Sequence, residues 1–438
     1  MIRDYDTLAR SPAHDCALDC LEAGIEAAQP RTVVAETVQR TGEQLRIDDA
    51  VYDLEAYERV VVLGGGKAAA QVARELEAIL GDALTGGVVV TDDPEACDRV
   101  TVREGDHPVP SQRGVEGAEA VLEQARAADE STLVLAVITG GGSALLPAPA
   151  EAVGLEALQS VTDALLSSGA TIDEINAVRK HCSRLKGGRL AAAAAPATVA
   201  TLVFSDVVGD DLSVIASGPT VPDETTFADA LAVLDRYDID APAVRDYLTA
   251  GVDGDVSETP SPGDPAFDRV STHILADAWT ALEAARSTAR ERGYETMVLS
   301  SRLRGEAREA GLAHLAVAEE VVATGNPVEP PAVVLSGGEL TVTVRGDGEG
   351  GPNQEFALAG AIDLPPGAVL AAVDTDGRDG ASDAAGAIVD SETVTDTAAA
   401  RDALDDNDAG GYLAGRDARI VTGRTGTNVN DLRVLVVD

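Results

Sequence analysis

The chain has 438 residues, and its 75 Asp and Glu residues outnumber its 33 Lys and Arg residues, which gives a formal net charge of −42 at pH 7. This charge argues against nucleic acid as a partner, because nucleic-acid binding needs a basic face. A hydrophobic content of 45% is sufficient for a buried core and excludes intrinsic disorder. The length predicts two domains, with three as the upper bound.

Lysine is almost absent from the chain. Only Lys67, Lys180 and Lys186 are lysines, and all three lie in or near glycine runs. Because acidic residues are spread over the whole length, this composition is typical of a halophilic enzyme from a cytoplasm rich in potassium salt. The chain has no apolar leader and no run of the roughly 18 apolar residues of a membrane span. We therefore expect a cytoplasmic protein that does not bind membranes.

The first half of the chain alternates apolar runs with helical segments. Residues 12–45 have the spacing of an amphipathic helix, and residues 68–80 that of a second helix. Predicted strands lie at residues 59–63, 87–91, 132–138 and 200–204. This pattern indicates a buried parallel sheet with crossover helices. In such sheets the functional site lies at the carboxyl ends of the strands.

The second half begins after residues 251–268, which are polar and rich in turn formers and therefore predict a domain boundary. Predicted strands follow at residues 272–276, 296–300, 332–335, 340–345, 369–373, 386–389 and 432–437. Residues 340–345 alternate Thr and Val, which indicates an antiparallel pair in a mixed sheet. The predicted fold class is α/β with two domains: a Rossmann-like parallel sheet with flanking helices over 1–250, and an α/β domain with a mixed sheet over 269–438.

Two glycine-rich turns each follow a predicted strand. They contain Gly64, Gly65, Gly66 and Lys67 in the first turn, and Gly140, Gly141, Gly142 and Ser143 in the second. Backbone N–H groups at the start of a helix suit an anion, and a lysine ammonium suits a phosphate or carboxylate. Each turn alone is also compatible with a purely structural role. Ser143 lacks the G-x-S-x-G pattern of a nucleophile, so we interpret it as a hydrogen-bond donor or helix cap.

Two aspartates are candidate metal ligands. Asp206 ends a predicted strand, and Asp376 lies in a loop over residues 374–380 that follows another. Mg²⁺ prefers one or two carboxylates together with waters and phosphate oxygens. The second loop fails the spacing of an EF-hand, so we interpret it as a metal or substrate loop, with an Asx turn as the alternative.

The ordered motifs match a known family. They are GGGKA, DHPVP, TGGGSALL, INAVRKHCSRLKGG, SDVVGDDLSVIASGPTVPD, LSGGE, NQE, DTDGRDGASDAAG and GTNVND. Together they resemble the glycerate 2-kinase family, whose C-terminal half carries the MOFRL domain, and the similarity covers about residues 12–438. The resemblance implies ATP-dependent phosphorylation of D-glycerate to 2-phosphoglycerate with Mg²⁺. It also implies an active site in the cleft between two α/β domains, and a functional lysine at Lys67. The sequence leaves open whether the chain forms a homodimer.

Phosphoryl transfer requires that the reacting groups are positioned and that the charge on the phosphoryl group is neutralised. The roles predicted for the residues below follow from these two requirements. The predicted catalytic residues are Lys67, Asp206 and Arg424, and the predicted metal ligands are Asp206 and Asp376. Besides the two glycine turns with Ser143, the ATP-binding residues are predicted to be Lys186, Asn353, Thr425, Thr427 and Asn428. The predicted substrate-binding residues are Arg179, Lys180 and Glu339.

The chain departs from the family pattern at two positions. Pro352 stands where the family has arginine, and Arg424 stands where it has proline. We predict that Arg424 supplies the guanidinium that is missing at position 352. A catalytically inactive metabolite sensor is suggested only by Pro352.

An oxidoreductase is the alternative function. A nicotinamide-dependent hydroxypyruvate reductase would use Gly64, Gly66 and Ala69 as a dinucleotide fingerprint, with Asp92 or Asp93 on the ribose. Lys67 inside the turn and a second glycine loop argue against this alternative.

Overall fold

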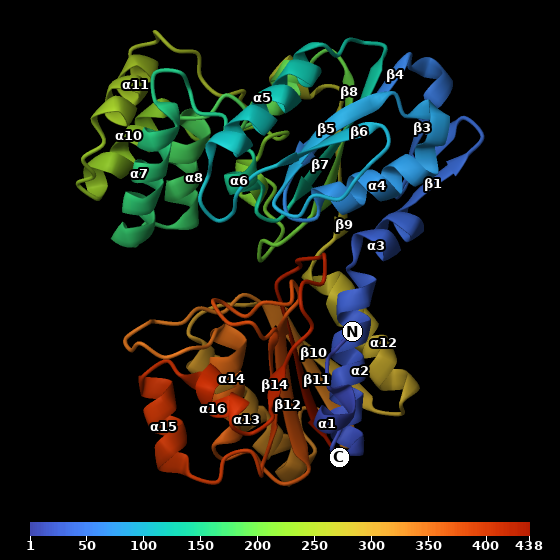
Figure 1. The fold of residues 1–438 in the computed structure, drawn as a ribbon, viewed down its shortest axis with the longest axis vertical. Helices are drawn as coiled ribbons and strands as arrows, with labels where there is room; N and C mark the ends of the chain where they lie inside the picture. The colour runs from blue at the N-terminus through green and yellow to red at the C-terminus, as the bar shows by residue number, and fades with distance from the viewer. The chain divides into compact units, whose positions relative to one another are not determined.

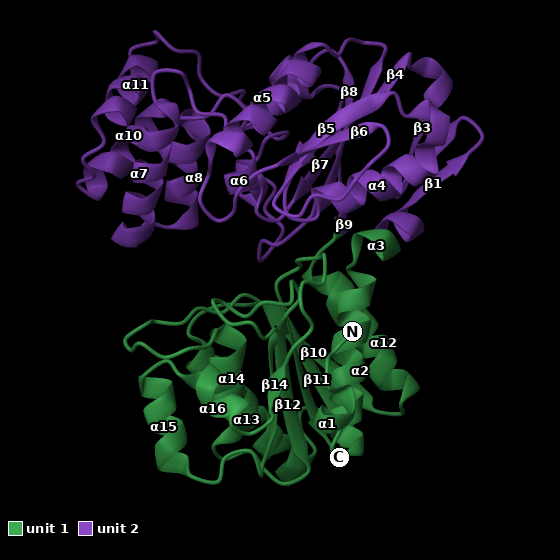
Figure 2. Ribbon diagram, viewed as in Figure 1, with its two compact units in different colours: residues 1–32, 276–438 green, residues 33–275 purple.

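The structure, a computed structural model, describes residues 1–438 and divides them into two compact units (Figure 2). Unit 1 contains residues 1–32 and 276–438, and unit 2 contains residues 33–275. The predicted domain 269–438 therefore includes residues 269–275, which belong to unit 2 and form most of strand β9 (Val270–Ala276). The predicted domain 1–250 includes residues 1–32, which belong to unit 1. The reason is helix α2 (Pro12–Ala27), whose apolar face, including Leu18 and Ile25, is buried against α12 and β15 of unit 1.

Unit 2 is built on a six-stranded sheet in the order β6-β5-β4-β7-β8-β9. Its strands are β4 (Arg59–Gly65), β5 (Gly86–Thr91), β6 (Val100–Glu104), β7 (Thr132–Thr139), β8 (Thr198–Phe204) and β9 (Val270–Ala276). The pairs β5–β6, β4–β5, β4–β7 and β7–β8 are parallel, which confirms the predicted parallel sheet. Helix α5 (Gln112–Arg126) covers one face and α4 (Ala69–Leu80) the other (Figure 1). The carboxyl ends of β4, β7 and β8 therefore share one edge.

A helical cluster extends this sheet. It consists of α7 (Gly154–Ser168), α8 (Ile172–His181), α10 (Phe227–Arg236) and α11 (Pro242–Val252), which lie beside one another in Figure 1. They share a core that includes Leu165, Val178 and Phe227. Short helices α6 (Gly142–Leu145) and α9 (Arg189–Ala194) connect the cluster to the sheet.

The helix predicted over residues 12–45 is wrong beyond Ala27. Pro30 begins a separate helix, α3 (Pro30–Thr37), because proline cannot continue the preceding one. A three-stranded antiparallel sheet then follows, made of β1 (Val38–Thr41), β2 (Gln44–Ile47) and β3 (Ala50–Asp53).

Unit 1 contains a mixed sheet in the order β10-β11-β15-β12-β13-β14. Its strands are β10 (Glu295–Leu303), β11 (Ala332–Gly338), β12 (Ala368–Asp374), β13 (Gly386–Asp390), β14 (Arg419–Ile420) and β15 (Asp431–Val437). Only β10–β11 is parallel among the paired strands. Helices α2 and α12 (Ala278–Glu291) cover one face, and α13 (Ala307–Thr324) and α14 (Pro352–Ala361) cover the other (Figure 1). The remaining helices are α1 (Tyr5–Leu8), α15 (Thr397–Asp405) and α16 (Ala409–Ala414).

The strand predicted over residues 340–345 does not form. Thr341 makes one isolated bridge to Glu306, and the carboxylate of Glu306 accepts the hydroxyl and the backbone N–H of Thr343. The alternation arises because Leu340 is buried and Val342 packs against the same core, without a neighbouring strand. Periodicity alone therefore predicted the burial of Leu340 and Val342, but it was wrong for Val344, which is 75% exposed, and for the strand pairing.

None of the three lysines is fully exposed to solvent. Lys180 and Lys186 are only 5% and 2% exposed, and Lys67 is half-buried. The solvated surface is thus acidic and almost free of lysine. No helix has the length and apolar character that a membrane crossing requires.

Thermal stability should depend on salt. The excess of acidic over basic residues causes self-repulsion, and raising KCl from about 0.1 M to about 2 M shortens the range of that repulsion severalfold. We expect a higher melting temperature at the higher concentration, measured by circular dichroism. Equal melting temperatures would contradict the proposed salt adaptation.

Candidate active site

The two glycine turns lie side by side because β4 and β7 pair in parallel. A side chain on Gly64 would place its Cβ 1.9 Å from the carbonyl oxygen of Val137, and one on Gly66 would place it 2.1 Å from Thr139 Oγ1. Only glycine permits this close approach. The N–H of Lys67 then donates to the carbonyl of Gly140 at 2.8 Å, which joins the two turns directly.

The second turn also contacts both predicted catalytic residues of unit 2. A Cβ on Gly140 would lie 2.4 Å from Asp206 Oδ2, and one on Gly141 would lie 3.1 Å from Lys67 Cγ and 3.0 Å from His107 Cδ2. Lys67 and Asp206 therefore reach adjacent residues of one loop. The sequence predicted both residues separately, and the structure brings them together.

Gly140→Ala should impair catalysis without unfolding the protein. The new methyl group would overlap Asp206 Oδ2, which is the end of a side chain and can move while the backbone stays in place. We expect kcat to fall about tenfold, because a carboxylate displaced by a fraction of an ångström is misplaced for transfer. Gly415→Ala is the control, since its nearest neighbour is 3.5 Å away and its backbone is helical. An unchanged kcat in Gly140→Ala would contradict the assignment of Asp206.

Asp206 is suited to a divalent cation through its position. It lies two residues beyond the end of β8, is half-buried, and lies beside Gly140 of the second glycine turn. No group of three or more His, Cys, Asp or Glu side chains in the structure could enclose a metal ion. The single carboxylate of Asp206 fits Mg²⁺, which keeps several waters and takes few protein ligands.

Ser143 is the first member of a buried hydrogen-bond chain. Its Oγ lies 3.0 Å from Ser217 Oγ, which donates to Asn176 Oδ1 at 2.9 Å. Ser217 and Asn176 are buried residues that the sequence did not single out. The motif INAVRKH contained Asn176, but nothing in the sequence pairs it with a serine 41 residues away.

The two buried lysines have structural partners. Lys186 Nζ donates to the carbonyl of Ala216 at 3.3 Å, and Lys180 forms a buried ion pair with Asp223 at 3.2 Å. Burial pushes the pKa of Asp223 upward, but the charge of Lys180 and the groups of Thr225 outweigh it and lower that pKa. Both ammonium groups therefore have partners within the protein, a carbonyl for Lys186 and a carboxylate for Lys180.

Lys186 should make stability depend on pH. Burial lowers its pKa to about 7, and the positive charge of Arg179 adds to the shift. Between about pH 7 and pH 10 the unfolded chain therefore holds a proton that the folded chain lacks, so the free energy of unfolding rises with pH. From about pH 6.5 to pH 9, this rise should exceed that of Lys186→Met by more than about 1.4 kcal/mol, the equivalent of one pKa unit. Urea unfolding at both pH values measures it, and parallel pH profiles would contradict the assignment.

In unit 1, Asp379 caps the N-terminus of α14. The backbone N–H groups of Asn353 and Gln354 donate to its two carboxylate oxygens at 2.9 and 2.8 Å. Asn353 Nδ2 also donates to Asp379 at 3.3 Å and to Asp431 at 2.6 Å, and Asp431 is paired with the fully buried Arg433. Burial raises the pKa of Asp379 to about 7. Asn353, a predicted ATP-binding residue, is thus buried in a structural network.

The predicted metal loop and the loop before β15 are tied together. Thr425 Oγ1 donates to the carbonyl of Thr375 at 2.6 Å, and the N–H of Thr425 donates to the carbonyl of Asp376 at 3.3 Å. Thr375 Oγ1 in turn donates to the carbonyl of Asn430 at 2.6 Å. Asp376 Oδ1 accepts the N–H of Arg378 at 2.8 Å, which is the Asx turn that the sequence left open.

The remaining predicted residues of unit 1 differ in exposure. Thr427 is buried and donates to the carbonyl of Ala28 at 2.6 Å, while Asn428 Oδ1 accepts the backbone N–H two residues further on. Arg424 and Glu339 are exposed. The predicted site residues thus form two groups, one in each unit, and the predicted position of the active site between the domains stays a prediction.

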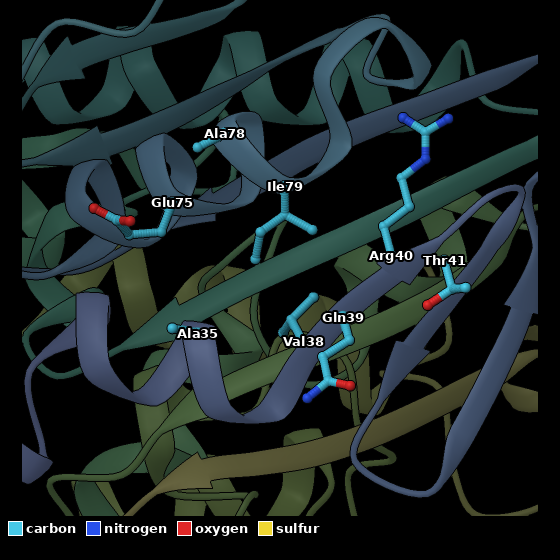
Figure 3. A pocket seen from close by; sticks show the side chains of 8 residues that line it. All are labelled: Ala35, Val38, Gln39, Arg40, Thr41, Glu75, Ala78 and Ile79. Carbon is cyan, nitrogen blue, oxygen red and sulfur yellow. The ribbon is translucent and has the colours of Figure 1, made fainter.

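Unit 2 contains two cavities of several hundred Å³. One of about 500 Å³, between α4 and the α3–β1 segment, contains none of the predicted residues (Figure 3). Its lining is Ala35, Val38, Gln39, Arg40, Thr41, Glu75, Ala78 and Ile79. The other, of about 810 Å³, is lined in part by Asn176, Lys180 and Asp223 on the α8 side. Only the second therefore borders predicted site residues.

Comparisons with known proteins support the resemblance seen in the sequence. A family model described as a domain of unknown function (DUF4147) matches residues 16–249, and the MOFRL family model matches residues 332–431. A relative from Agrobacterium vitis with the provisional name hydroxypyruvate reductase is 42% identical over 390 residues, 86% of this chain and 87% of the relative.

Two Thermotoga maritima comparisons cover nearly the whole chain. The protein named D-glycerate 2-kinase is 39% identical over 426 residues, which are 95% of this chain and 96% of the relative. A crystal structure of a glycerate kinase matches with a TM-score of 0.85 and 37% identity, covering 97% of this chain and 99% of that one. This agreement in sequence and fold shows that the chain belongs to the glycerate 2-kinase family with a C-terminal MOFRL domain.

Proposed function

We propose that the chain is a glycerate 2-kinase, which transfers the γ-phosphoryl group of ATP to the 2-hydroxyl group of D-glycerate. The observation that carries the proposal is the 39% identity to a D-glycerate 2-kinase over 95% of the chain. The joined glycine turns support it, because they bring Lys67 and Asp206 to one loop.

The residues of unit 2 have distinct roles in this proposal. The N–H groups of the second glycine turn cradle phosphate oxygens, whereas those of Gly66 and Lys67 in the first turn are donated to the carbonyls of Val90 and Gly140. Lys67 neutralises charge on the transferring group or on the glycerate carboxylate through its side chain. Asp206 holds Mg²⁺, and the bound ion would neutralise phosphate charge. Arg179 is a second anion ligand. Lys180, already paired with Asp223, supports the site.

In unit 1, the role of each residue follows from its exposure. Arg424 and Glu339 are exposed and are proposed to contact ligand directly. Thr425 and Asn428 are proposed as hydrogen-bonding residues for ATP. Asn353 and Thr427 have structural partners and are proposed to hold these loops in place. Asp376 is proposed as a second metal-side carboxylate.

One assay tests the proposal. The protein is incubated with ATP, Mg²⁺ and D-glycerate at high KCl, and the product is identified by ³¹P and ¹H NMR. We expect 2-phosphoglycerate. The 3-phosphate isomer would contradict the regiochemistry, and a lack of phosphorylated product would contradict the kinase proposal.

The reductase alternative has one observation in its favour, the provisional name of the Agrobacterium vitis relative. Incubating the protein with hydroxypyruvate and NADH tests it at little cost. We expect no oxidation of NADH above the rate without enzyme. Turnover in this assay together with none in the kinase assay would favour the reductase.

A further inference from the structure

A buried turn with an unusual backbone lies under the second glycine loop. Ala216 and Ser217 are consecutive non-glycine residues with φ of 50° and 62°, in the left-handed region. This conformation is unfavourable for both residues, and such strain persists only where the surroundings hold it. Ser217 is fully buried, so its surroundings are protein.

Hydrogen bonds from two other segments hold this turn. The N–H groups of Gly187 and Gly188 donate to the carbonyls of Ser217 and Gly218 at 3.0 and 2.7 Å, and Lys186 Nζ donates to the carbonyl of Ala216. The hydroxyl of Ser217 donates to Asn176 of α8. Lys186, which the sequence predicted to bind ATP, therefore holds the turn together with the two glycines that follow it.

This turn supports the second glycine loop, which contains Gly142 and Ser143. A Cβ on Gly142 would lie 2.8 Å from the Cβ of Ala216, so the two segments are in close contact. A serine hydroxyl has one proton, and that of Ser217 is donated to Asn176. Ser143 must therefore donate its own proton to Ser217 across their 3.0 Å separation. This fixes the rotamer of Ser143 and leaves its oxygen able to accept a further hydrogen bond.

We propose that Ser217 is a positioning residue for phosphoryl transfer. Its hydroxyl fixes the Ser143 end of the second glycine loop, and the other end of that loop lies against Asp206 and Lys67. The inference rests on the proposed kinase function. Without the hydroxyl the loop can shift. This shift lowers kcat for phosphoryl transfer more than it changes the KM values for ATP and D-glycerate.

The test compares Ser217→Ala with Ser217→Gly. Both remove the hydroxyl, but glycine adopts a positive φ without strain, so Ser217→Gly should melt at or above the temperature of Ser217→Ala. For both variants we expect kcat to fall about fivefold to tenfold, the effect of one buried hydrogen bond, with KM values for ATP and D-glycerate within about twofold. Recovery of kcat in Ser217→Gly would show that only backbone strain matters and would overturn the proposal.

Thr201→Val is the matched control, because it removes another buried hydroxyl from unit 2, one without a hydrogen-bond partner. Its kcat should equal that of the wild type. Asn176→Ala should reproduce the effect of Ser217→Ala, and the double variant should be no slower than either, since both act through one chain of bonds. Additive losses in kcat would contradict the chain.

Hydrogen exchange separates failure of this inference from failure of the proposed function. Faster exchange of the amides of residues 140–146 is expected in Ser217→Ala and not in Thr201→Val, whatever reaction the protein catalyses. Unchanged exchange in Ser217→Ala would overturn the inference even if the kinase assay succeeds. Absence of kinase turnover in the wild type would remove the proposed function, and the exchange result would then decide on the role of Ser217 in holding the loop.

Discussion

Lys67→Ala is expected to reduce kcat about 100-fold to 1000-fold, the usual effect of removing one charged group that stabilises a transition state. The fold should survive, because the substitution leaves two backbone hydrogen bonds of residue 67 in place. The N–H of Lys67 donates to the carbonyl of Gly140, and its carbonyl accepts the hydroxyl of Thr91 at 3.0 Å. Alanine keeps both. Steady-state kinetics measure the effect on kcat, and the melting temperature measures the effect on stability. Activity within threefold of the wild type would contradict the assignment of Lys67 as a catalytic residue.

Lys180→Ala provides the contrast with Lys67→Ala. Its ammonium is paired with Asp223 in the interior, and removing one partner of a buried pair typically costs about 3–5 kcal/mol of stability. We therefore expect Lys180→Ala to lower the melting temperature strongly, whereas Lys67→Ala should not. If both variants instead lost stability equally, Lys67 would be structural as well.

Strands β4, β5, β7 and β8 of unit 2 could be predicted because their apolar residues form nearly continuous buried runs, whereas the edge strand β6 was not predicted, because most of its residues are polar or exposed. The run Thr132–Thr139 is buried at every residue and pairs on both sides. Each of β4, β7 and β8 also ends in a motif of glycine or aspartate. The local sequence therefore predicts both the strand and the motif at its carboxyl end. Parallel pairing of the strands then predicts which of these motifs meet at the edge of the sheet.

Contacts between distant segments could not be predicted in the same way. Helix α2 has an amphipathic pattern that is equally compatible with covering either sheet, and its position in unit 1 depends on the surface of β15. The cap of α14 by Asp379 and the bond of Ser217 to Asn176 join segments that no local pattern relates. Arg433 did give a signal: a charged residue inside an otherwise apolar strand must find a buried partner, here Asp431.

Arg424→Ala is expected to reduce kcat/KM for ATP or D-glycerate about tenfold to 100-fold, the cost of one hydrogen bond to a charged group. That Arg424 replaces an arginine at position 352 stays a prediction, and it requires that the two loops lie near one another. Pro352 begins α14, and its Cδ lies 3.7 Å from a Cβ built on Gly380. A Cβ on Gly377 would lie 1.9 Å from the carbonyl of Gly423, the residue before Arg424. Both loops thus pack against one turn, over residues 376–380, so a guanidinium from either could serve the same anion.

A double substitution tests whether the two positions are interchangeable. Pro352→Arg in the Arg424→Ala background should restore part of the lost kcat/KM, because the first turn of α14 accepts arginine without loss of a backbone hydrogen bond. Pro352→Arg alone should change kcat/KM little, since Arg424 already supplies the charge. Arg401→Ala, which removes an exposed arginine of α15, controls for the loss of one positive charge from this acidic unit. Kinetics of Arg424→Ala equal to those of Arg401→Ala would show that Arg424 is a solvated loop residue. A loss without recovery in the double variant would show instead that it contacts ligand from a position that residue 352 cannot reach.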